Sequence, residues 1–148
     1  MLIDSQNQFS DQQAVTATGA TASTHTIDLG SSRDIGSAAV DRLALLCQVA
    51  VAFASGGAAT LQVQIQTAPD NGAGAPGSWT TLAQSDAVPV ASLVQGWRFL
   101  PGGLPGGTQR FLRLNYVVGT AAMTAGKLSA GLVPALDVRR TYPRGYAA

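Results

Sequence analysis

The stretch "TLQVQIQTA", residues 60–68, decides the fold class. Aliphatic residues at positions 61, 63 and 65 alternate with glutamines at positions 62, 64 and 66. Successive side chains of a β-strand point to opposite faces of the sheet, so this alternation predicts a half-buried strand. One buried and one polar face is typical of antiparallel sheets.

The segment immediately before this stretch predicts a second strand. Residues 43–53 are apolar at every odd position, and the even positions are mostly small. A helical stripe through Val40, Leu43, Cys47 and Ala50 is the competing interpretation, but the alternation favours a strand with its odd face inward and a largely covered second face. We expect Gly56-Gly57 to turn this strand into a hairpin with 58–68.

Further strands complete an all-β pattern. We expect them at 14–18, 24–29, 79–82, 87–94, 97–100, 110–118 and 127–133, and Pro89 restricts its strand to an edge or a bulge. In 110–118, the inward face consists of Leu112, Leu114, Tyr116 and Val118. About eight short strands without convincing helical periodicity predict a single-domain antiparallel β-sandwich or jelly roll over 12–136, with arms at 1–11 and 137–148.

Charge is scarce in this chain. Its 148 residues carry a net charge of +1, and 11% are charged against about 25% in average soluble proteins. Either a biased composition or a surface that becomes covered in an assembly explains the scarcity, since interface cores are depleted in charge. The balance offers no general field for nucleic acid or an anionic membrane, so neither is an expected partner. No apolar run is long enough for a membrane span, and no secretory signal is visible.

Residues capable of catalysis or metal binding are few and scattered. One cysteine and one histidine exclude an intramolecular disulfide and a zinc cluster. Cys47 lies on the inward stripe and is expected to be an inert core thiol. His25 has only Ser23 and Thr24 beside it as candidate nucleophiles, and neighbours in a strand point to opposite faces, which argues against a catalytic dyad. Asp28 is expected to support a turn. We therefore expect no catalytic residue, metal or cofactor, and no enzymatic activity.

The glycine-rich stretch 100–111, "LPGGLPGGTQRF", is not a phosphate cradle. A P-loop requires Gly-Lys-Ser/Thr at the start of a helix, and here no lysine follows and the next element is a strand. It is interpreted as a connection between strands.

The two tryptophans suggest different roles. Trp97 lies two residues from Phe99, which favours a buried aromatic pair. Trp79 follows a Gly/Pro-rich loop, and it is the candidate for an exposed platform that stacks on sugar.

Both chain ends contain residue types common at interfaces. Arginine and tyrosine dominate binding hot spots, and aliphatic or aromatic side chains act as anchors. Frayed ends are the alternative, but we favour an interface and therefore name partner-binding candidates. They are Leu2, Ile3 and Phe9 at the start, and Arg139, Arg140, Tyr142, Arg144 and Tyr146 at the end.

Several motifs along the chain resemble those of a known family. "MLIDSQNQFSDQQAVTATGA", "TIDLG" with "RDIG", "GWRFLP", "RFLRLNYVV", "TAGKLSAGLV" and "YPRGY" together resemble the jelly-roll capsid cement, or decoration, proteins of tailed bacteriophages with HK97-like capsids. The resemblance runs nearly end to end and contains no catalytic motif.

The resemblance implies a structural role in the virion. Such a protein is made in the host cytoplasm and binds the outer surface of the capsid, where it stabilises the shell by bridging subunits. The implied partners are the major capsid protein and the protein itself, as a homodimer or other homo-oligomer. A tail, fibre or baseplate module, with carbohydrate bound at Trp79, is the alternative. If the arms grip neighbours, deleting 137–148 weakens capsid occupancy and leaves the domain folded.

Overall fold

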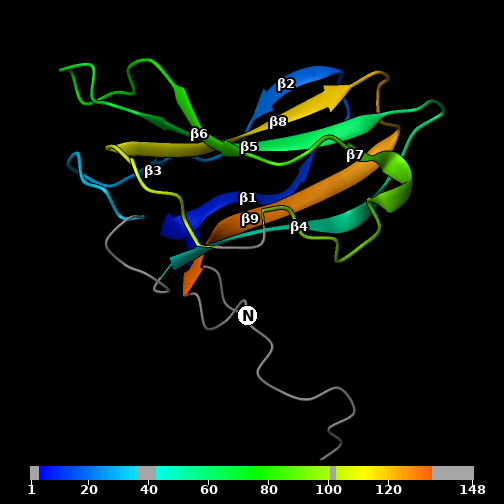
Figure 1. Ribbon diagram of the computed structural model, residues 1–148, viewed down its shortest axis with the longest axis horizontal. Helices are drawn as coiled ribbons and strands as arrows, with labels where there is room; N and C mark the ends of the chain where they lie inside the picture. The colour runs from blue at the N-terminus through cyan, green and yellow to red at the C-terminus, as the bar shows by residue number, and fades with distance from the viewer. Residues whose placement is uncertain (1–3, 37–42, 101–102, 135–148) are drawn as a thin grey trace, which may run out of the picture.

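The computed structural model describes residues 4–36, 43–100 and 103–134, and within them the chain forms two facing antiparallel sheets (Figure 1). This confirms the predicted all-β sandwich. In chain order the elements are η1 (Ser5–Asn7), β1 (Gln8–Ala14), β2 (Gly19–Ala22), β3 (Ile27–Asp28), β4 (Leu43–Ala54), β5 (Thr60–Ala68), β6 (Thr80–Gln84), β7 (Val88–Pro89), η2 (Val90–Ser92), β8 (Phe111–Gly119) and β9 (Ala125–Pro134).

Two strand pairs form the centres of the layers. One sheet has the order β1-β9-β4, and the other has the order β2-β8-β5-β6, with β3 on β8 and β7 on β5. β4 pairs with β9 along most of its length, and β5 pairs with β8 from Thr60↔Gly119 to Ala68↔Phe111. All of these strand pairings in the described residues are antiparallel.

The core lies between the sheets, where the period-2 pattern places it. The inward residues of β5 and β8 are each at most 2% exposed, as the alternation predicts. They are Leu61, Val63, Ile65, Leu112, Leu114, Tyr116 and Val118.

The first half of β4 is covered on both faces. Its odd residues Leu45, Cys47 and Val49 face the main core, while Ala44 and Leu46 form a second buried cluster with Val133. The expected covered second face is therefore confirmed for this half of the strand. Val51 departs from the pattern at 43% exposed, because the β4–β9 register shifts between Val49 and Val51.

The expected hairpin at Gly56-Gly57 is wrong. β4 and β5 lie in different sheets, so residues 55–59 cross from one layer to the other. Residues 120–124 likewise cross between the layers, from β8 to β9. The two connections contact each other, because the Ser55 hydroxyl donates to the Ala122 carbonyl at 2.7 Å. Each central strand gains a long partner from a distant segment, and this pairing outweighs the local turn.

The predicted N-terminal arm is too long. Residues 8–14 form β1 on β9, and Phe9 is 0% exposed in the core. Phe9 is therefore unavailable to a partner, and its prediction as a contact residue is wrong. Residues 1–3 and 137–148, which contain the other candidate contact residues, lie outside the described residues.

Some of the predicted strands differ in position or extent. The predictions for 14–18 and 24–29 are replaced by β2 and the two-residue β3, and 87–94 contains β7 followed by η2. Pro89 does lie at a sheet edge, as expected. Residues 97–100 form no strand but follow the edge of β4, where Val49 N–H donates to the Trp97 carbonyl at 2.8 Å and Phe99 N–H to that of Cys47 at 2.9 Å.

Candidate partner-binding surfaces

The outer face of the larger sheet carries a set of polar side chains that we call the amide face. The polar positions of β5 alternate with its buried ones and meet the corresponding positions of β6 and β8. The amide face consists of Gln62, Gln64, Gln66, Trp79, Thr81, Gln84, Arg113 and Asn115.

Hydrogen bonds join the amides across three strands. Gln64 is the centre: its Oε1 accepts from Asn115 Nδ2 at 2.9 Å and from Gln66 Nε2 at 3.3 Å, and its Nε2 donates to Gln84 Oε1 at 3.2 Å. Arg113 Nε donates to Gln66 Oε1 at 2.9 Å. Because these side chains already hold one another in place, a partner that docks here loses less side-chain entropy than it would on a mobile surface.

Arg113 and Trp79 form one end of the amide face. The guanidinium carbon lies 4.1 Å from the Trp79 ring centroid, in a cation–π contact. Partial burial lowers the pKa of Arg113 from its ordinary value, and an arginine still remains protonated at neutral pH. The amide face therefore has one formal charge and an otherwise neutral hydrogen-bonding surface.

The two open sides of the sandwich are built differently. On the β1 side, His25 N–H donates to the Phe9 carbonyl at 2.9 Å. The Gln13 side chain donates to the Ala22 carbonyl and accepts from Thr24 N–H, both at 2.9 Å. These hydrogen bonds attach residues 22–25 to β1 and so cover this side of the sandwich.

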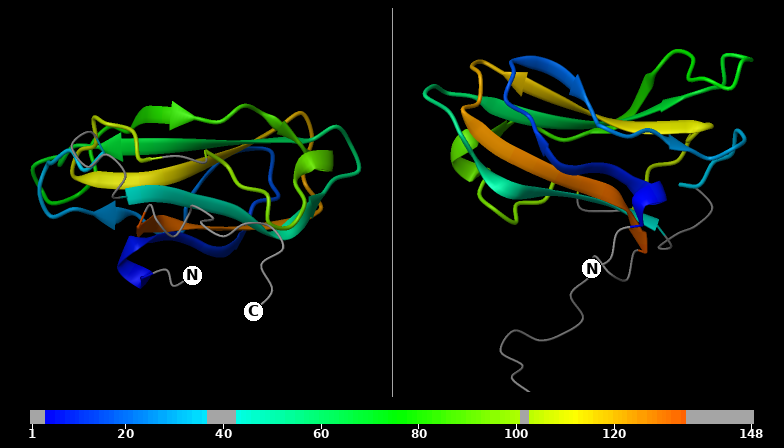
Figure 2. Two further views of the ribbon diagram at one scale, coloured as in Figure 1. Left: turned by 60° about the horizontal axis from the view of Figure 1, so that its bottom comes forward. Right: turned by 180° about the vertical axis from the view of Figure 1, so that it is seen from behind.

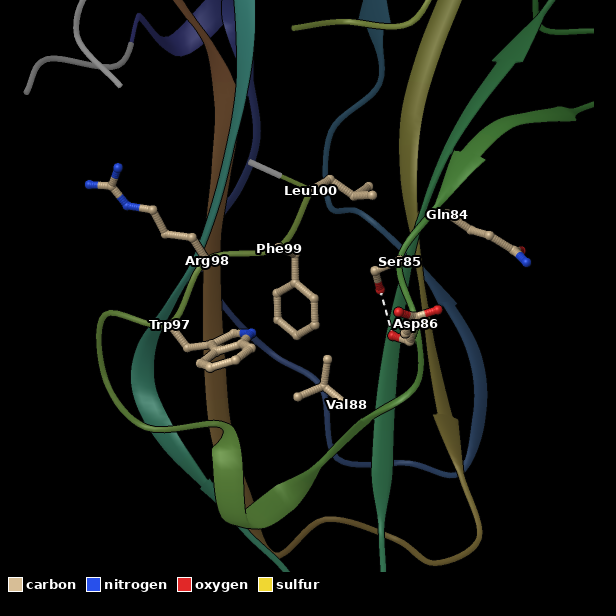
Figure 3. A pocket seen from close by; sticks show the side chains of 8 residues that line it. All are labelled: Gln84, Ser85, Asp86, Val88, Trp97, Arg98, Phe99 and Leu100. Atoms are coloured by element: carbon tan, nitrogen blue, oxygen red, sulfur yellow. Dashed lines mark hydrogen bonds between the residues drawn. The ribbon is translucent and has the colours of Figure 1, made fainter. Parts of the chain in front are cut away.

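The opposite side holds a shallow pocket of about 350 Å³ that we call the edge slit (Figure 3). It lies between the segment after β6 and the segment that follows the β4 edge. Phe99, Trp97 and Val88 point into it, whereas Arg98 and Gln84 point away. The lining residues are Gln84, Ser85, Asp86, Val88, Trp97, Arg98, Phe99 and Leu100.

The predicted aromatic pair is half correct. Phe99 is buried at 2% exposed, but Trp97 is 39% exposed and lines the edge slit. The prediction assumed that 97–100 was a regular strand with both rings on one face. Instead, Gly96 adopts φ +87° and the segment bends around the β4 edge, which exposes Trp97. Trp79, the candidate sugar platform, is half-buried beneath Arg113.

An ion-pair cluster joins the loops at one end of the larger sheet. Arg110 contacts Asp28 through Nε at 2.9 Å and Nη2 at 3.0 Å, and its Nη1 contacts Asp70. The Arg110 hydrogen bonds and the Gly30 N–H lower the pKa of Asp28. The Gly72 N–H, with Gly74 and Arg110, lowers the pKa of Asp70. Asp28 also accepts from Gly30 N–H at 2.8 Å, which confirms its predicted role in a turn.

Two titratable side chains, Cys47 and Tyr116, are buried in the core. Burial raises the pKa of the Cys47 thiol to about 12, which suits the predicted inert core cysteine. Burial also raises the pKa of Tyr116, whose hydroxyl shares a 2.7 Å hydrogen bond with the Ser10 hydroxyl. Among the described residues, no group of three or more His, Cys, Asp or Glu side chains could hold a metal ion. Within that same part of the chain, no helix has the length and apolar character required to cross a membrane.

Comparison with known protein families gives a match for this chain. Residues 9–132 match the Bbp16 family, and the match covers both sheets of the sandwich. The chain therefore belongs to the Bbp16 family, which points to a phage-related protein. No curated protein matches the sequence.

Sequence reasoning located part of these surfaces. The Gln/Leu alternation of 60–68 already marked one polar face, but it could not show that Asn115, Arg113 and Gln84 join it from distant strands. The edge slit had no signal in the sequence, because its walls come from two segments whose closeness depends on the packing of the sheets.

Proposed function

We propose that this protein is a capsid decoration protein that binds the outer surface of a tailed-phage shell and stabilises it by bridging major capsid protein subunits. Membership of the Bbp16 family supports a phage-related role. The amide face is the observation that carries the structural part of the proposal, because it offers a preorganised, nearly neutral surface over three strands.

The mechanism is linkage between docking and shell stability. A protein that binds the assembled shell and not its separated subunits stabilises the shell by mass action. Each copy needs only modest affinity, because one that engages two subunits at once gains from effective concentration. The low charge of the amide face suits this role, since burying unpaired ions at an interface is costly. The protein has no enzymatic role in this proposal.

A matched pair of substitutions tests the amide face. Gln64→Glu places a carboxylate at the centre of the amide face, whereas Gln48→Glu makes the same change on β4 of the smaller sheet. We expect Gln64→Glu to weaken binding to undecorated shells by about tenfold or more, since a desolvated charge is penalised. Gln48→Glu should bind nearly as the parent does.

The readout is the number of bound copies per purified shell at increasing protein concentration. Equal urea midpoints for the two variants exclude unfolding as the cause. If the Gln64→Glu variant decorates shells as fully as the parent protein does, the amide face is not the surface that binds the capsid. Removal of residues 137–148 is the companion test, and it should reduce occupancy if the C-terminal segment contributes contacts.

The alternative is a tail, fibre or baseplate module that binds carbohydrate at Trp79. Arg113 covers one face of the Trp79 ring at 4.1 Å, which leaves less aromatic surface for a sugar. This contact favours the decoration role. Copy number separates the two, because a decoration protein is abundant in the virion and a tail component is scarce. Glycan-array binding that is lost in Trp79→Ala would favour the alternative.

A further inference from the structure

The edge slit presents apolar surface that the described chain leaves partly open. Trp97 is 39% exposed, and Val94, three residues before it, is 57% exposed. Both lie on the segment that hydrogen-bonds along the β4 edge, where Phe53 N–H donates to the Leu93 carbonyl at 3.0 Å. An exposed aromatic wall beside a shallow pocket is suited to a bulky apolar side chain.

The negative charge at the rim of the edge slit favours an occupant that carries a cation. Asp86 is exposed at one wall of the edge slit, and Arg98 points away from the slit (Figure 3). An occupant that combines an aromatic ring with a nearby cation would therefore complement both the apolar wall and the rim. The sequence Tyr142-Pro143-Arg144-Gly145-Tyr146 has this combination.

The C-terminal segment is long enough to reach the edge slit of its own molecule. β9 ends at Pro134 opposite Leu43, and Arg98 lies opposite Gln48 on the other edge of β4. With strands about 4.8 Å apart and about 3.4 Å per residue, Pro134 and Arg98 are about 20 Å apart. Eight residues from Pro134 to Tyr142 span up to about 27 Å when extended.

The expected dissociation constant and effective concentration favour docking within one molecule. A single ring in a shallow pocket and one exposed ion pair give a dissociation constant in roughly the millimolar range. A short tether provides an effective concentration of the order of millimolar, which is enough to populate such a contact. Separate molecules at micromolar concentration would not populate it.

We propose that the edge slit binds the C-terminal segment of the same molecule, with a tyrosine ring of 142–146 against Trp97 and Arg144 beside Asp86. This inference goes beyond the capsid role, because it concerns the free protein. It makes the edge slit a peptide-binding site with a defined occupant.

Trp97 fluorescence in the full-length protein tests the docking. Trp79→Phe leaves Trp97 as the single tryptophan, since the chain has two. Adding Tyr142→Ala and Tyr146→Ala should increase acrylamide quenching of Trp97 and shift its emission to longer wavelength. Unchanged quenching would overturn the proposal.

A charge exchange tests the second contact. Asp86→Lys and Arg144→Asp should each lower the docking equilibrium constant by up to about fivefold, and the double variant should restore it. Arg139→Asp, an identical charge change five residues away, should have the smaller effect. Failure of the double variant to restore quenching would overturn the pairing. Quenching that falls as protein concentration rises would overturn docking within one molecule, because the segment would then come from a second copy.

Discussion

At Gly126, the backbone of β9 lies directly against the ring of Phe53. Its φ of +136° is rarely adopted by residues with a side chain, and a Cβ atom there would collide with three atoms of the ring. Phe53 is itself 7% exposed within the main core, so it has little room to move. Glycine is therefore required here by both conformation and space.

We predict that Gly126→Ala lowers the free energy of unfolding by at least ~2 kcal/mol, because overpacking and backbone strain act together. Urea denaturation followed by tryptophan fluorescence measures the change. Gly56→Ala is the control, since a Cβ atom there meets nothing within 4 Å. Equal midpoints for both variants would show that the Phe53 ring relaxes freely.

At the scale of elements, the Arg110 cluster fastens a loop to two strands. Arg110 precedes β8, Asp28 ends β3, and Asp70 lies in the loop between β5 and β6. Asp70 also accepts from Gly72 N–H and Gly74 N–H, both at 2.9 Å, so one carboxylate orders its own loop and anchors it. Figure 2 shows this end of the larger sheet from two further sides.

The lowered pKa values of Asp28 and Asp70 give the cluster a pH dependence. A carboxylate with a folded-state pKa below its unfolded value adds stability above the unfolded pKa, near 4. That stability is lost as the pH falls through the lowered folded-state values.

We therefore expect Arg110→Gln to flatten the fall in stability below about pH 4, because the carboxylates lose their cationic partner. Urea midpoints measured at a series of acidic pH values give the slope. Since all three groups are solvent-accessible, high salt should reduce the difference between the parent and the variant. An identical acid slope in both proteins would show that the Gly72 and Gly30 N–H groups alone set these pKa values.

At the scale of the whole molecule, Cys47 reports on the separation of the two sheets. It is 0% exposed in the middle of β4, and its pKa is raised to about 12, so little thiolate exists at neutral pH. A thiol reagent reaches it when the β4–β9 pair leaves the core.

We predict that native protein reacts with a thiol reagent at neutral pH only as fast as it opens globally, and that urea increases this rate in step with unfolding. Cys47→Ala with Ala52→Cys provides the control, because Ala52 is exposed on the same strand and its thiol should react at once. Rapid modification of native Cys47 would show that the β4 edge opens locally.

The alternation of apolar and polar residues in the sequence determined where the main strands lie and which of their faces is buried. β4, β5, β8 and β9 lie close to where the pattern placed them, and the inward residues of β5 and β8 are those expected. This follows because side-chain direction in a strand is a property of adjacent residues. The inward position of Cys47 and the Asp28 turn follow from the local sequence in the same sense.

Tertiary structure decided how those strands are assembled and which side chains remain exposed. It placed β4 and β5 in opposite sheets, buried Phe9 and exposed Trp97. It also brought Gln64, Asn115 and Gln84 together into one surface. These outcomes depend on pairings between residues far apart in the chain, where burial of both sheets against one core outweighs the preferences of any single segment.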